Sequence, residues 1–106
     1  MTEFDQLEIG LYIQQIKTGK PCAYTNIKTK YLDDAIEYIE NEGLFTYVEE
    51  NLYGFSVLYF FKDEVMKEII THPSIPKTPK SNFDDWILGN LFGFSHESIV
   101  KFIKEK

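Results

Sequence analysis

Apolar residues recur at helical spacing near the start of this chain and predict a helix over residues 3 to 17. Thr2 and Asp5 have the spacing of an N-terminal capping box, and Gly19 and Pro21 follow where the helix should end. Two apolar stripes run along this segment. One contains Phe4, Leu7 and Leu11, and the other contains Ile9, Tyr12, Ile13 and Ile16. We therefore expect this helix to be covered on more than one side.

Four further segments show the same helical spacing. In the clearest, residues 31 to 42, the apolar positions fall at i, i+3, i+4 and i+7, and Gly43 follows as a C-terminal cap. These apolar positions are Leu32, Ala35, Ile36 and Ile39. The other segments are residues 63 to 71, residues 83 to 92, and a last helix capped by Ser95.

Two runs of aromatic and β-branched residues predict strands, at residues 44 to 50 and 55 to 61. The turn residues between them, 51 to 54, favour a hairpin. Residues 21 to 27 predict a further short strand. Both faces of the 55 to 61 strand are largely apolar, so we expect it to be central or covered by helices on both sides.

This order of elements predicts an α+β fold with a small, three-stranded, mainly antiparallel sheet and helices packed on it. The chain forms one domain, residues 1 to 106, with its α+β core in residues 1 to 71. Residues 72 to 82 contain three prolines and form a connecting arm. Residues 83 to 106 form a helical hairpin, which either docks on the sheet or extends to a second protomer.

Composition narrows the range of partners. The 106 residues carry a net charge of −6 and include no arginine, which argues against direct binding of nucleic acid or of an anionic membrane surface. No apolar run approaches the roughly 20 residues that span a bilayer. We expect a cytosolic protein whose partner is another protein.

The residues that commonly carry chemistry are few and scattered. The single cysteine, Cys22, leaves no disulfide and no cysteine pair for a metal, so we expect neither a metal nor a cofactor. His96 and Ser95 begin a helix, where Ser95 serves as the N-cap. The residues around Ser95 lack the second glycine of a nucleophile elbow, and a cysteine nucleophile at Cys22 would need a histidine brought close by the fold. The chain is therefore predicted not to be an enzyme.

The strongest functional signal is a segregation of charge. Residues 31 to 61 contain seven carboxylates and no lysine. They are Asp33, Asp34, Glu37, Glu40, Glu42, Glu49 and Glu50. Asp33, Glu37 and Glu40 share one helical face, although like charges at this spacing disfavour an isolated helix. Glu49 and Glu50 end the first hairpin strand, so all five could form one rim that docks on a basic surface. The alternative is an acidic face that only keeps the protein soluble.

A second feature lies near the C-terminus. The pattern W-x-x-G-x-L-x-G-[FY]-S in residues 86 to 95 resembles a segment of small uncharacterised bacterial and phage proteins, and the resemblance implies no activity. Its residues form a candidate interface for a homodimer or a partner, or a helix-turn-helix corner inside one fold. They are Trp86, Gly89, Phe92, Gly93 and Phe94.

The sequence thus predicts a small acidic protein-binding module, of the kind that phages or mobile elements encode to modulate or inhibit a basic partner such as a nucleic-acid-binding protein. The first alternative is an assembly protein that self-associates through the helix from Trp86 to Phe94. A small enzyme that uses Cys22 or His96 is the third hypothesis.

Overall fold

The three strands form one antiparallel sheet in the order β1-β3-β2. The computed structural model describes residues 1–50 and 53–106, except the side chain of Glu50. Strand β3 (Phe55–Phe61) pairs on one side with β1 (Cys22–Lys28) and on the other with β2 (Phe45–Glu50). Between β1 and β2 the chain passes through a short 3-10 turn (Thr29–Tyr31) and helix α2 (Leu32–Asn41). The predicted α+β fold with a three-stranded antiparallel sheet is confirmed.

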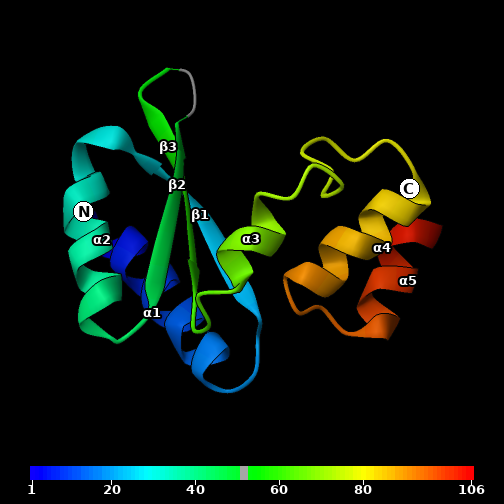
Figure 1. Ribbon diagram of the computed structural model, residues 1–106, viewed down its shortest axis with the longest axis horizontal. Helices are drawn as coiled ribbons and strands as arrows, with labels where there is room; N and C mark the ends of the chain where they lie inside the picture. Colours follow the sequence, from blue (N-terminus) through cyan, green and yellow to red (C-terminus); the bar gives the residue numbers. More distant parts are fainter. Residues whose placement is uncertain (51–52) are drawn as a thin grey trace.

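Helices α1 (Glu3–Lys17) and α2 cover one face of this sheet (Figure 1). The predicted capping box is present, because Thr2 Oγ1 accepts the N–H of Asp5 while the Asp5 carboxylate accepts the N–H of Thr2. The main core lies between these helices and the inward residues of the strands. Its fully buried members include Ile9, Ile13, Ile39, Leu58 and Phe60.

The opposite face of the sheet carries a smaller core. Cys22 and Phe61 pack there with Ile70 of helix α3 (Met66–Ile70) and Leu91 of helix α4 (Asn82–Leu91). Strand β3 is thus central and packed on both faces, as predicted. Helix α3 is shorter than the predicted 63 to 71, because the chain before it forms tighter turns in which the N–H groups of Met66, Lys67 and Glu68 bond to carbonyls three residues back.

The C-terminal helices, α4 and α5 (His96–Lys104), form a hairpin beside this second face (Figure 1). Ser81 and Ser95 cap them, each through a hydroxyl that accepts a backbone N–H. The turn between the helices docks on β1 of the same chain, where the rings of Phe92 and Tyr24 lie 4.8 Å apart. In the part of the chain that the structure describes, no helix is both long and apolar enough to cross a membrane.

Candidate protein-binding surface

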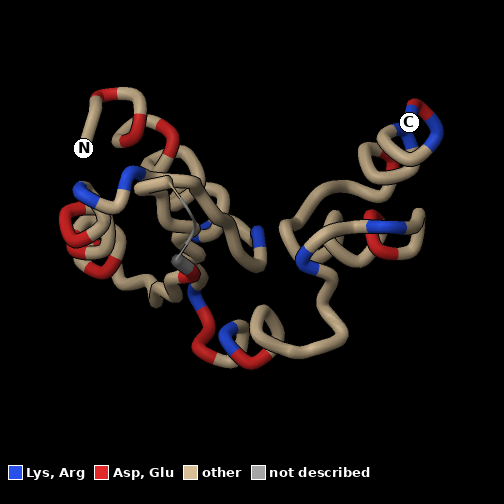
Figure 2. The backbone as a smooth tube through the Cα atoms, turned by 90° about the horizontal axis from the view of Figure 1, so that it is seen from above, with Lys and Arg blue, Asp and Glu red and all other residues tan. Residues whose placement is uncertain are grey.

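The acidic residues of α2 lie on the side of the helix that faces away from the sheet. Ala35 and Ile39 are buried against the sheet, whereas Asp33, Glu37 and Glu40 are exposed on the other side. Figure 2 shows acidic positions along α2 at the edge of the molecule that carries the N-terminus. The structure therefore brings together these three predicted residues, with Asp34 beside them.

Most of these carboxylates lack a cationic partner. Lys17 of α1 pairs with Glu42 at 2.7 Å, but no lysine among residues 1–50 and 53–106 forms an ion pair with Asp33, Asp34 or Glu37. Glu40 accepts only a long hydrogen bond from Thr46, at 3.5 Å. Asp33 and Asp34 lie in the first turn of α2, where the helix dipole favours an acid. Glu37 and Glu40 gain no such stabilisation, so their negative charge is available to a partner.

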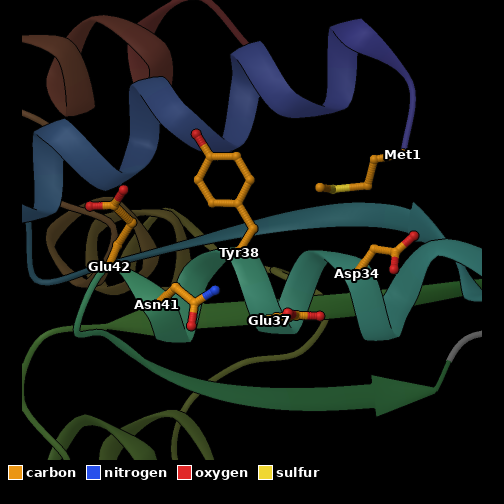
Figure 3. A pocket seen from close by; sticks show the side chains of 6 residues that line it. All are labelled: Met1, Asp34, Glu37, Tyr38, Asn41 and Glu42. Carbon is orange, nitrogen blue, oxygen red and sulfur yellow. The ribbon is translucent and has the colours of Figure 1, made fainter.

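A shallow, open groove of about 420 Å³ runs along α2 on the side toward α1 and the N-terminus (Figure 3). Tyr38 rises from α2 toward α1 at its centre, and Asp34, Glu37 and Glu42 lie around it. A Cβ at position 10 would come within 3.2 Å of the Tyr38 hydroxyl oxygen, so Gly10 leaves room for this side chain. The sequence pattern indicated neither this groove nor the purpose of Gly10.

Helix α1, which lies beside α2, carries an exposed apolar stripe. Phe4, Leu7 and Leu11 are 70%, 72% and 59% exposed, whereas Ile9 and Ile13 on the opposite side of the helix are buried. The prediction that α1 is covered on more than one side is therefore wrong within this chain, because the sheet and α2 cover only its inner side. Three large apolar side chains in helical register on one exposed face are typical of an interaction surface.

One of the two remaining acidic residues of the predicted rim, Glu49, lies away from this surface. Val48 packs in the core under α1 and α2, so its neighbour Glu49 points to the opposite face of the sheet. There Glu49 pairs with Lys77 of the connecting arm. The side chain of Glu50 lies outside the described residues. Of the five predicted residues, Asp33, Glu37 and Glu40 thus form the candidate site.

The two glycines of the C-terminal pattern serve packing within the chain. A Cβ at Gly89 would lie 2.6 Å from Cγ1 of Ile99 in α5. Gly93 has φ +75°, and a Cβ there would lie 2.9 Å from side-chain atoms of Lys20 and Pro21. Both glycines therefore allow the helical hairpin to close and to dock on β1.

The aromatic residues of the same pattern differ in exposure. Phe92 is partly buried against Tyr24, whereas Trp86 and Phe94 are 44% and 57% exposed. The ring of Trp86 stacks on the exposed ring of Phe83, with centroids 6.4 Å apart. Helix α4 therefore presents a second, smaller apolar patch, formed by Phe83 and Trp86.

The geometry does not activate the candidate nucleophile. Cys22 is fully buried, its thiol donates a long hydrogen bond to the carbonyl of Leu91, and burial raises its pKa to about 12. A thiol of this kind stays protonated at neutral pH. His96 is exposed at the start of α5. Within the described residues, no group of three or more histidine, cysteine or acidic side chains could hold a metal ion.

No protein-family model matches this chain, and no curated protein matches it. The geometry of the surface formed by α1 and α2 is therefore the basis for assigning a function.

Proposed function

We propose that this protein is a binding module whose acidic α2 face docks on a basic surface of a protein partner, in the cytoplasm. The observation that carries the proposal is the set of exposed carboxylates on α2 that have no lysine partner among the described residues. The outer face of α2 is a patch of one sign beside a groove, and such a patch attracts a partner of the opposite sign.

The partner is best suited to this surface if it carries clustered lysines or arginines, as the groove of a nucleic-acid-binding protein does. Occupying such a groove would make the module a modulator or inhibitor of that protein. Charged faces steer the encounter of two proteins, so association should be fast and should weaken as salt is added.

Charge reversal on α2 should abolish partner capture. The variant Asp33→Lys/Glu37→Lys/Glu40→Lys replaces three exposed carboxylates with cations that repel a basic surface. We expect the wild-type protein to retain a basic protein from a lysate of its source organism at low salt and to release it as salt is raised. The triple variant should retain none, as measured by affinity capture and mass spectrometry.

A matched control separates the site from overall charge. Glu64→Lys/Glu68→Lys/Glu105→Lys makes the same change in net charge at three exposed carboxylates away from α2. This control should capture the same partner as the wild type. Circular dichroism should show that both variants are folded. Equal capture by the wild type and the α2 variant would refute the proposal.

A second candidate function is self-association through α4, which the exposed stacked rings of Phe83 and Trp86 favour. Sedimentation equilibrium should then show a dimer whose affinity hardly depends on salt, since apolar contacts are not screened. Phe83→Ala/Trp86→Ala should dissociate it. Substitution of Gly93 is not a suitable test, because a side chain there would collide with Lys20 and Pro21 of its own chain. A monomer at all concentrations would exclude this function.

A further inference from the structure

We infer that the partner presents an amphipathic basic helix, which lies along α1 with its apolar side on Phe4, Leu7 and Leu11 and its cations toward the carboxylates of α2. This inference rests on the proposed function and specifies the chemistry of the partner at the same surface. It joins two features of one layer of the fold, the exposed apolar stripe of α1 and the unpaired acidic residues of α2.

The apolar half of the surface has the spacing by which one helix packs against another. Phe4, Leu7 and Leu11 occupy positions i, i+3 and i+7 of α1, so they form a stripe about 10 Å long over two helical turns. A partner helix meets such a stripe with its own residues at i, i+3 or i+4, and i+7. The stripe points directly away from the buried side of α1, so the chain itself leaves it open.

The charged half lies along one side of this stripe. Helices α1 and α2 cover the same face of the sheet (Figure 1) and touch each other, since Lys17 of α1 pairs with Glu42 beside the end of α2. Asp34 and Glu37 line the groove along α2, and the aromatic ring of Tyr38 stands between them and α1 (Figure 3). A helix that rests on the stripe therefore places its flanking lysine or arginine side chains within reach of Asp34 and Glu37.

The net negative charge of the chain makes a second copy of it an unfavourable partner for the apolar stripe. Each copy carries a net charge of −6, and each would bring its own acidic α2 beside the shared stripe. Like charges brought together at an interface are unfavourable, whereas a cationic helix neutralises the same carboxylates. The apolar stripe alone would accept either occupant, and the neighbouring acidic residues select the basic one.

The test uses a synthetic peptide of about 18 residues, long enough for a helix of several turns. Its leucines follow helical spacing and its flanking positions are lysines. A control peptide has the same composition with the leucines scattered around the helix. Titration calorimetry with the full-length protein should give measurable binding of the amphipathic peptide and at least about tenfold weaker binding of the scattered one, which cannot bury its leucines together.

Two protein variants separate the halves of the surface. Leu7→Gln/Leu11→Gln should weaken binding of the amphipathic peptide by about tenfold or more at any salt concentration. Asp34→Asn/Glu37→Gln should weaken it at about 0.1 M salt but much less near 1 M, where the Debye length falls from about 10 Å to about 3 Å. Phe83→Gln, which removes an equally exposed ring from α4, should bind the peptide as the wild type does.

The outcomes are distinguishable from those of the proposed function. Equal binding of the two peptides, or unchanged binding by Leu7→Gln/Leu11→Gln, would overturn the inference. The proposed function would still stand if charge reversal on α2 abolished partner capture. Sedimentation could also show a dimer that Leu7→Gln/Leu11→Gln dissociates. That result would overturn the inference of a basic partner helix, because a second copy of the chain would then occupy the stripe.

Discussion

Replacing Phe60 with alanine should lower the free energy of unfolding by about 3–5 kcal/mol, the largest effect on stability expected from a single side chain here. Phe60 is fully buried in the core between the sheet and the helices α1 and α2. Its ring lies 6.3 Å from that of Tyr12 on α1. The substitution removes most of the ring volume from a site where strand β3 is held on both sides, so the cavity can collapse only partly.

The matched control is the same substitution at Phe4. This side chain is 70% exposed, so Phe4→Ala should change the free energy of unfolding by no more than about 0.5 kcal/mol. Urea denaturation followed by far-UV circular dichroism measures both variants. Similar losses at the two positions would contradict the assignment of one ring to the core and the other to the surface.

The same pair of variants also connects stability with function. Phe4→Ala should weaken binding of the amphipathic basic peptide while leaving the fold intact, because Phe4 contributes to the open stripe. Natural chains usually bury large apolar residues, and those left open on one helix face contribute little to folding. The partner binding that we propose would account for these exposed residues.

The secondary structure followed from the sequence where the apolar periodicity was long or strongly marked. The α1 helix and its capping box, the α2 helix and the hairpin of β2 and β3 all lie close to their predicted positions. The predicted helix over 63 to 71 was too long, because its first residues form tighter turns with hydrogen bonds to carbonyls three residues back, which the apolar spacing does not distinguish from an α-helix.

The candidate site could be predicted only in part. Helical spacing placed Asp33, Glu37 and Glu40 on one face, and the structure places them there. Glu49 was wrongly grouped with them, because successive residues of a strand point to opposite faces and the sequence did not show which face α2 covers. The stripe of Phe4, Leu7 and Leu11 was recognised as apolar, but its exposure depends on how α1 packs on the sheet.

Chemical labelling of Cys22 should be slower than that of a free thiol by about three orders of magnitude at neutral pH. Burial raises the pKa of this thiol from 9.0 to about 12, and the thiolate fraction at neutral pH falls about tenfold each time the pKa rises by one. Since the side chain is fully buried, labelling also requires local opening of the contact between β1 and α4, and sub-denaturing urea should accelerate it.

The raised pKa of Cys22 also predicts how stability depends on pH. Below about pH 9 the thiol is protonated in both the folded and the unfolded chain, so Cys22 adds no pH dependence. Between about pH 9 and 12 only the unfolded chain loses the proton. The free energy of unfolding should therefore fall by up to about 1.4 kcal/mol for each increase of one in pH, and Cys22→Ala should remove this part of the slope. Rapid labelling near neutral pH without denaturant would contradict both expectations and favour an enzyme that uses Cys22.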